Sequence, residues 1–241
     1  MKALVIIPTY NERRTIEEMI REVLGFGFDV LVIDDNSPDG TAERIKQLAF
    51  ENPHIHLLQR PRKLGLGSAY REGFRFALAH DYEAIFEMDG DGSHRPHYLP
   101  RLLEALESSD IVIGSRYVKG VSVIDWPMGR LLLSYLANVF SRLMTGLPIH
   151  DMTAGFKCFR RSALEALEIE AVHSEGYSFQ IEVNFILYRK GFRFREIPII
   201  FEDRNVGVSK MSRWIIFEAL WIVLKLSWIR LIGRFRRKRS R

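Results

Sequence analysis

Three short hydrophobic runs in the first ninety residues each end in a polar cluster that contains at least one acidic residue, and this pattern constrains the fold more than any other feature of the chain. The runs 3–7, 29–33 and 84–88 are followed by Pro8-Thr-Tyr-Asn-Glu12, by Asp34-Asp-Asn-Ser-Pro-Asp39 and by Asp89-Gly-Asp-Gly-Ser93. Helical patterns separate the runs, which is typical of a parallel sheet covered by helices on both faces. Because ligands of open α/β sheets bind beyond the carboxyl ends of the strands, we expect the three clusters to share one cleft.

The remaining elements follow from the same patterns. Further strands are expected at 55–58, 111–113 and 192–201, and helices at 15–24, from 41, at 68–80, at 128–144 and at 211–233. Thr15 and Glu18 have the spacing of a capping box at the start of the first helix. Cys158 is the single cysteine, which excludes an intramolecular disulfide, and we expect it in a half-buried strand.

The positive charge is concentrated at the C-terminal end. The chain has 35 Lys and Arg against 30 Asp and Glu, a net charge of +5. Residues 230–241 hold seven basic residues and no acid, so residues 1–229 carry a net charge of −2. This distribution gives no reason to expect nucleic-acid binding, and it favours a local anionic partner for the tail.

The segment Asp89-Gly90-Asp91 is a candidate metal site. Two carboxylates separated by one small residue can share a divalent cation, and Mg²⁺ and Mn²⁺ prefer oxygen ligands and often bridge to substrate phosphates. Asp and Gly are also common in solvated turns. Its position beside two other acidic strand ends favours the metal.

Gly65-Leu-Gly67 does not have the spacing of a dinucleotide-binding fingerprint. It predicts a tight turn into a helix, and the functional alternative is contact of Arg60 or Lys63 with a nucleotide or its phosphates. The sequence shows no recognisable Ser–His or Cys–His nucleophile.

The early clusters, together with Gly65-Leu-Gly67, resemble those of inverting GT-A glycosyltransferases. The later segments look like those of dolichol-phosphate (polyprenol-phosphate) mannosyltransferases; they are Gly114-Ser-Arg-Tyr117, Asp151-Met-Thr-Ala-Gly-Phe156, Gly176-Tyr-Ser-Phe-Gln-Ile-Glu182 and Asp203-Arg-Asn-Val-Gly-Val-Ser-Lys210. The resemblance implies a Rossmann-like GT-A catalytic domain over 1–212, with a nucleotide-binding half at 1–118 and an acceptor half at 119–212.

The resemblance also implies a reaction, in which mannose passes from GDP-mannose to a polyprenyl phosphate with inversion, releasing GDP. By position, the guanosine would be held by Pro8, Tyr10, Glu12 and Asp35. The metal and donor diphosphate would be held by Asp89, Asp91 and Ser93, with Arg204 and Lys210 closing over the diphosphate. The acceptor phosphate would be held by Arg116, Arg130 and Ser134. Many relatives have glutamine in place of Ser93, and the shorter serine leaves room for a bridging water.

The chemistry of the acceptor agrees with this set of residues. The second pKa of a phosphate monoester is about 6, so the acceptor is mostly dianionic at neutral pH and attacks without a strong general base. It needs positioning, and the planar guanidinium of arginine suits phosphate oxygens. Arg130 and Ser134 are four residues apart on a predicted helix, so they face the same way.

Residues 213–241 are predicted to form an amphipathic helix and a basic tail that attach the protein to a membrane. Trp214, Trp221 and Trp228 recur every seven residues, with Glu218 and Lys225 beside them, which is typical of a helix lying in a membrane interface. The basic tail would meet anionic headgroups. The alternative is a core helix with a solvated tail. The short apolar run after Met1-Lys2 does not resemble a signal peptide, so we expect peripheral attachment to the cytoplasmic face.

Two other functions stay open on the sequence alone. One is a related transferase that moves glucose or an N-acetylhexosamine from a nucleotide to the same lipid phosphate. The other is a non-catalytic adaptor that binds a lipid phosphate or a nucleotide at the membrane surface.

Overall fold

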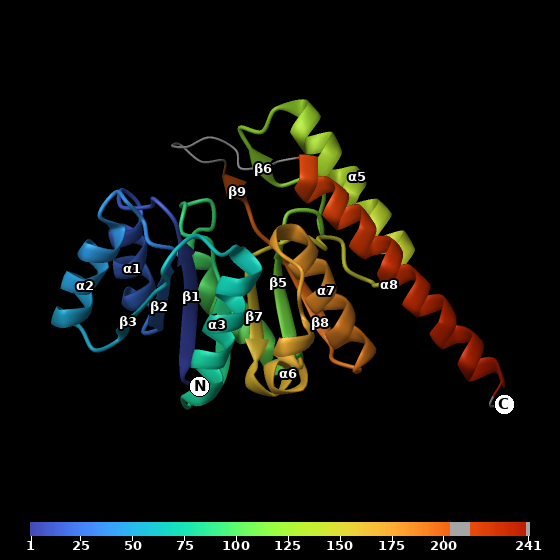
Figure 1. The fold of residues 1–241 in the computed structure, drawn as a ribbon, viewed down its shortest axis with the longest axis horizontal. Helices are drawn as coiled ribbons and strands as arrows, with labels where there is room; N and C mark the ends of the chain where they lie inside the picture. The colour runs from blue at the N-terminus through green and yellow to red at the C-terminus, as the bar shows by residue number, and fades with distance from the viewer. Residues whose placement is uncertain (203–212, 240–241) are drawn as a thin grey trace.

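A seven-stranded, mostly parallel sheet forms the centre of the protein (Figure 1). The computed structural model describes residues 1–202 and 213–239, and within these the side chains of 1–202 and 217–232. The strands are β1 (Ala3–Thr9), β2 (Asp29–Asp34), β3 (Ile55–Gln59), β4 (Ala84–Glu87), β5 (Ile111–Ser115), β7 (Lys157–Arg160) and β8 (Phe194–Pro198). Their order is β3-β2-β1-β4-β7-β5-β8, and β7 runs antiparallel to both of its neighbours. A separate pair joins β6 (Val123–Ile124) to β9 (Phe201–Glu202).

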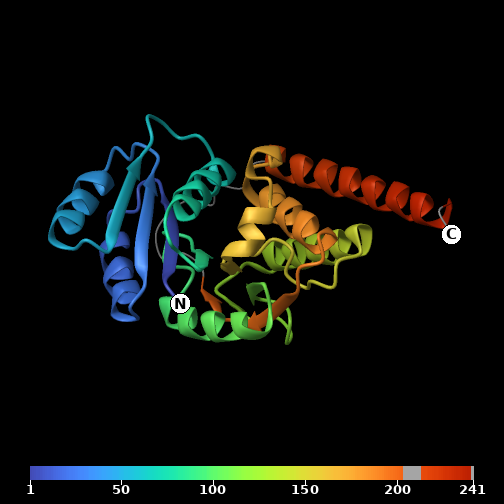
Figure 2. The same ribbon diagram turned by 90° about the horizontal axis from the view of Figure 1, so that it is seen from below.

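Helices cover both faces of the sheet, as expected. One face packs on α1 (Ile16–Gly25), α2 (Thr41–Glu51) and α4 (Leu99–Ala105); the other packs on α3 (Leu66–Ala79), α6 (Arg161–Ala166) and α7 (Gly176–Arg189). Figure 2 shows α3 and α4 on opposite sides of the strands. Alternation along β1 explains the two cores, since Val5 and Ile7 belong to one and Leu4 and Ile6 to the other.

The structure differs from the sequence-based expectations in three places. β7 is a central strand, so Cys158 is fully buried and the prediction of a half-buried strand is wrong. The strand expected at 192–201 ends at Pro198 in the main sheet. The prediction of a capping box at the start of α1 is also wrong. The Thr15 side chain does not cap the helix, and its hydroxyl donates to the carbonyl of Gly90 at 2.9 Å.

Two further helices lie against the end of the domain. α5 (Met128–Thr145) and α8 (Arg213–Arg239) pack against each other, and α8 also packs along α7 (Figure 1). Beyond α7 the far end of α8 projects from the rest of the molecule. Among the described residues, no helix has the combined length and hydropathy that a membrane-spanning segment requires. The sheet also crosses the expected boundary at residue 118, because β7 and β8 pair with strands of the first half.

Candidate active site

The ends of β1 and β2 are tied together by short polar contacts. Thr9 donates from its hydroxyl to Asp34 at 3.1 Å, and the backbone N–H of Asn11 donates to the Ser37 hydroxyl at 3.0 Å. The N–H of Asp35 donates to the carbonyl of Thr9 at 3.1 Å. Parallel pairing of β1 with β2 and with β4 therefore brings the three polar clusters to one edge, as the sequence predicts.

The acidic segment after β4 crosses close against β1. A Cβ added to Gly90 would lie 3.1 Å from the carbonyl oxygen of Pro8, a tight contact, so glycine at this position lets the segment lie close to the strand. Ser93 donates from its hydroxyl to the Asp91 carboxylate at 2.6 Å. Tyr70, buried beneath, lies with its hydroxyl 3.4 Å from Asp89. Ser93 thus orients Asp91.

His94 is a site residue that was not predicted from the sequence. The N–H of Asp89 donates to His94 Nδ1 at 3.0 Å, and the imidazole stacks on Phe156 with ring centroids 4.9 Å apart. Burial lowers the pKa of His94, opposed by the charge of Asp89. His94 is therefore neutral near pH 7 and supports the loop that carries the two aspartates.

Asp35 organises the loop before α3. Its carboxylate pairs with the buried Arg60 and accepts the backbone N–H of Leu64 at 3.2 Å. Arg60 also donates to Ser68 at 2.7 Å and to the carbonyl of Gly65 at 3.0 Å. Arg60 is thus held by protein groups.

The N-terminus of α3 is occupied by an internal carboxylate. Glu175 accepts the backbone N–H groups of Gly67 and Ser68 at 2.7 and 3.0 Å and pairs with Arg71 at 3.0 Å. A Cβ at Gly67 would lie 2.5 Å from the carbonyl of Ser174, and one at Gly65 would overlap Glu175. The two glycines thus make room for this capping carboxylate, in agreement with a tight turn into a helix.

Arg116 is a buried ion-pair residue at the centre of the site. Its Nε and Nη2 donate to the two oxygens of Asp151 at 2.7 and 2.6 Å, and Nη2 also donates to Thr153 at 2.9 Å. The rings of Trp126 and Phe201 lie 5.6 and 5.5 Å from its guanidinium carbon. Asp151 therefore balances the charge of Arg116.

Two cavities meet beside Arg116. The smaller, of about 80 Å³, is lined by Asp89, Asp91 and His94 and reaches Arg130. The larger, of about 300 Å³, is mostly apolar and lies between α5 and α8. Five residues line both, namely Arg116, Trp126, Arg130, Thr153 and Tyr177. An apolar space therefore leads to the acidic pair past two arginines.

Trp126 lies between those arginines. The Arg130 guanidinium lies over its ring at 4.1 Å, and its indole Nε1 is shielded from solvent with no acceptor among the described residues. Ser134, one turn beyond Arg130, accepts the hydroxyl of Tyr117 at 2.8 Å. The structure thus brings Arg116, Arg130 and Ser134 together, as expected, and adds Trp126.

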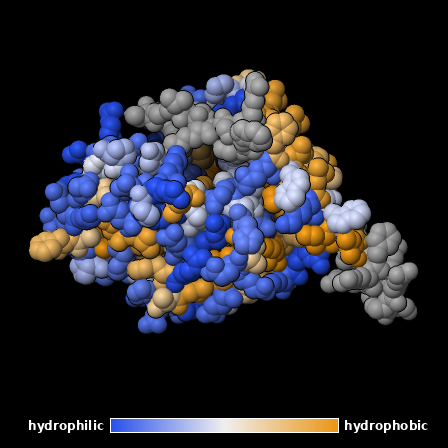
Figure 3. Space-filling view, in the orientation of Figure 1, coloured by the Kyte–Doolittle hydropathy of each residue, from blue (hydrophilic) through white to orange (hydrophobic). Residues whose placement is uncertain are grey.

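Polar side chains of α5 face the protein, and many of its apolar side chains face outward. Asn138 and Ser141 are buried, whereas Leu136 and Leu143 are 61% and 71% exposed. On α8, Trp221 is 62% exposed on the outward side. Figure 3 shows hydrophobic residues gathered over α5 and α8. Both helices therefore present an apolar outer surface.

Two buried titratable side chains, those of Glu87 and Lys157, lie on neighbouring strands close to the aspartates. Glu87 and Lys157 are cross-strand neighbours on β4 and β7. Burial raises the pKa of Glu87 to about 7 and lowers the pKa of Lys157 to about 8. Lys157 donates to Asn184 of α7 at 2.9 Å, and Asn184 donates to the carbonyl of Met152 at 3.2 Å. This cluster joins the strand that carries Asp89 to the loop that carries Asp151.

The remaining sequence-predicted residues lie at the same edge, with two exceptions. Pro8 lies near the end of β1, Tyr10 and Glu12 follow the strand, and the ammonium of Lys63 lies 4.4 Å from the centre of the Tyr10 ring. Arg204 and Lys210 fall outside the described residues.

The acidic pair fits a divalent cation that is completed by a ligand. Asp89 and Asp91 present carboxylates at the edge of the small cavity. No group of three His, Cys, Asp or Glu residues suited to a metal occurs in the described part of the chain. An ion here would need further oxygens, and substrate phosphates supply such ligands for Mg²⁺.

Comparison with known proteins decides the family. The sequence model of "Glycosyl transferase family 2" matches residues 4–168. The chain is 44% identical over 223 residues to an undecaprenyl-phosphate mannosyltransferase of Micrococcus luteus, covering 91% of both chains. It is 46% identical to a polyprenol monophosphomannose synthase of Mycolicibacterium smegmatis, over 92% of this chain and 85% of that one. The chain belongs to glycosyl transferase family 2.

Within this family the chain groups with the polyprenyl-phosphate mannosyltransferases, which confirms the resemblance drawn from its motifs. The fold is shared more widely. A glucosyl-3-phosphoglycerate synthase of Mycobacterium tuberculosis, solved with Mn²⁺, UDP-glucose and phosphoglyceric acid, superposes with a TM-score of 0.69 at 18% identity, over 94% of this chain and 79% of that one. The GT-A fold is therefore confirmed.

Proposed function

We propose that the protein transfers mannose from GDP-mannose to the phosphate of a membrane polyprenol, with inversion, giving polyprenyl phosphate mannose and GDP. The observation that carries this proposal is the apolar cavity between α5 and α8, which meets the acidic cavity at Arg116 and Arg130. A lipid phosphate could lie with its chain in the first and its headgroup at the second. The names of the family relatives support the same acceptor class.

On the donor side, Pro8, Tyr10, Glu12 and Asp35 would surround the nucleoside. Asp89 and Asp91 would hold Mg²⁺ or Mn²⁺ together with the diphosphate, and Ser93 would orient Asp91. When bound, such a cation neutralises the negative charge that grows on the leaving diphosphate. Arg204 and Lys210 are proposed to add positive charge from the segment after β9.

On the acceptor side, Arg130 is the main proposed phosphate ligand. Arg116 shares its charge with Asp151, so its role is to hold Thr153 and Trp126 around the phosphate. The phosphate dianion attacks the anomeric carbon directly. Attack opposite the diphosphate would invert the anomeric centre.

The membrane supplies the acceptor, and the outer surfaces of α5 and α8 are the proposed contact. A helix with exposed Leu and Trp side chains gains free energy by lying in the interface between headgroups and acyl chains. The basic residues of 230–241 would add attraction to anionic lipids on the cytoplasmic face.

The test combines substrates and variants. The protein is incubated with Mn²⁺, polyprenyl phosphate in vesicles and a panel of radiolabelled sugar nucleotides, and the lipid-extractable product is counted. We expect product from GDP-mannose, and an Asp91→Ala variant should make none while keeping its circular dichroism spectrum. Arg130→Ala should raise the KM for polyprenyl phosphate and leave GDP affinity unchanged.

Incorporation from a glucose or N-acetylhexosamine nucleotide in place of GDP-mannose would redirect the proposal to that sugar. Binding of both ligands without any product would indicate an adaptor. A purely donor-side defect in the Arg130 variant would remove the acceptor role of that residue.

A further inference from the structure

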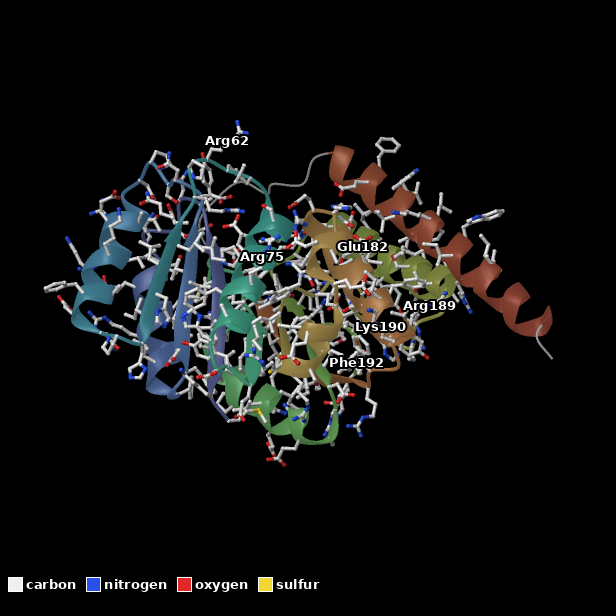
Figure 4. All side chains as sticks on the ribbon, turned by 60° about the horizontal axis from the view of Figure 1, so that its bottom comes forward. Arg62, Arg75, Glu182, Arg189, Lys190 and Phe192 are labelled. Carbon is white, nitrogen blue, oxygen red and sulfur yellow. The ribbon has the colours of Figure 1, made fainter. Side chains whose placement is uncertain are left out.

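A groove lined by arginines lies at the opposite end of α5 from Arg130. It has a volume of about 810 Å³ and is bounded by the turn after α5, by the end of α7 with the turn into β8, and by Arg230 of α8. Figure 4 shows Arg189, Lys190 and Phe192 at the end of α7. Fifteen helical residues separate Arg130 from the groove residue Thr145, which at 1.5 Å per residue is about 22 Å. The groove is therefore distinct from the acceptor phosphate site.

The groove is positively charged. Its lining includes Arg189, Arg193 and Arg230 and no acidic residue. Arg193 pairs with Asp110 at 3.3 Å. Arg189 donates to the carbonyl of Ile229 at 3.4 Å, and Arg230 donates to the carbonyls of Leu143 and Met144 at 3.1 Å. These carbonyls are neutral, and no carboxylate among the described residues forms an ion pair with Arg189 or Arg230, so two guanidinium charges are available to an anion.

The same groove is lined by hydrophobic rings and adjoins the apolar outer surface. Phe185, Phe192 and Phe194 contribute to its wall. Leu143, which supplies a carbonyl to Arg230, is 71% exposed, and Trp228 on α8 is 66% exposed. A ligand that suits this lining carries a negative headgroup next to an apolar chain.

We propose that this groove binds the headgroup of an anionic phospholipid, of the phosphatidylglycerol class, with its phosphate between Arg189 and Arg230 and its acyl chains along the aromatic wall. The site would fix the end of α8 at the level of the headgroups, so that the acceptor cavity opens toward the membrane. This inference rests on the membrane contact proposed above. It requires neither the donor nor the acceptor assignment.

The test compares two adjacent charges. Full-length protein is floated with phosphatidylcholine vesicles with and without phosphatidylglycerol, and Arg189→Gln is compared with Lys190→Gln. Lys190 is the matched control, because it lies next in sequence but pairs with Glu168 at 2.7 Å and does not line the groove. The preference is the ratio of binding to vesicles with and without phosphatidylglycerol. We expect this ratio to fall about fivefold in Arg189→Gln and to stay unchanged in Lys190→Gln.

A second measurement locates the lipid. Photoactivatable phosphatidylglycerol should label the peptide around Phe185–Phe194, and labelling should be lost in Arg189→Gln. Equal losses in the two variants would mean general surface charge and would overturn the proposal. If inorganic phosphate abolished the preference at matched ionic strength, the groove would bind a simple anion, and the proposal of a lipid headgroup would be overturned. Flotation with phosphatidylcholine but no gain from phosphatidylglycerol would remove the headgroup site alone, whereas no flotation at all would remove the membrane contact as well.

Discussion

Replacing Arg116 by alanine should cost more stability than any other change among the proposed acceptor residues. The substitution leaves the fully buried Asp151 carboxylate without its guanidinium partner. Removing one member of a buried ion pair costs about 3–5 kcal/mol. Asp151 would still accept the backbone N–H of residue 116 at 2.9 Å, so we expect the lower end, about 3 kcal/mol. For a chain of this size that corresponds to a melting temperature lower by about 6–12 °C.

The assay is urea unfolding followed by circular dichroism, in a double-mutant cycle with Asp151→Ala. We expect the double variant to be less destabilised than the sum of the single changes, with a coupling energy of about 2 kcal/mol. Arg130→Ala is the control. It removes the contact with the Trp126 ring, which is worth about 1 kcal/mol or less, and leaves no fully buried carboxylate of the Asp151 kind behind. A cost below about 1 kcal/mol for Arg116→Ala, or strict additivity, would refute the view that Arg116 is mainly a structural residue.

Four further outcomes are expected. Trp126→Phe keeps an aromatic ring but removes the indole N–H, so it should raise the KM for polyprenyl phosphate several-fold with unchanged GDP affinity; an unchanged acceptor KM contradicts a role for the indole N–H. Glu175→Ala removes the charged cap of α3 and should cost about 2 kcal/mol in urea unfolding, while Glu175→Gln should cost less because its carbonyl still accepts the backbone N–H groups; equal costs would argue against a charge effect. Two arginines lower the pKa of Glu17 from 4.5 to about 2, so the Glu17 carboxylate contributes stability above pH 4.5 that is lost as the pH falls toward 2. In Glu17→Gln the urea unfolding midpoint should therefore change less with pH between 4.5 and 2 than in the unmodified protein. Leu132→Glu places a charge on the outer side of α5 and should reduce vesicle flotation without changing the unfolding midpoint, since this side chain is 53% exposed; unaltered flotation would exclude α5 from the contact.

The sequence predicted those parts of the fold that depend on local pattern. Hydrophobic runs followed by acids identified the parallel strands, and their common direction was enough to bring Asp35, Asp89 and Asp91 to one edge. β7 was missed as a central strand because its four residues, Lys157–Arg160, include two charged ones, and only the tertiary partners of Lys157 in α7 make its burial tolerable. The residues of a single strand do not indicate which distant strand it will pair with.

The same limit applies to the site. The spacing of Arg130 and Ser134 placed both on one side of a helix, and the structure agrees. That Asp151 neutralises Arg116, that Glu175 fills the turn at Gly65 and that Trp126 lies between two arginines depend on contacts between distant segments. The sequence around each of these residues does not indicate which distant residue it contacts.

The inverted polarity of α5, with Asn138 buried and Leu143 outside, has a kinetic consequence. With the apolar side of α5 in a bilayer, as proposed above, the enzyme would meet its acceptor by lateral diffusion within a two-dimensional layer. Turnover should then follow the mole fraction of polyprenyl phosphate among the lipids, and adding inert phospholipid should slow the reaction even when the total amount of acceptor is constant. The water-borne donor, arriving at the other edge of the site, should show no such surface dilution.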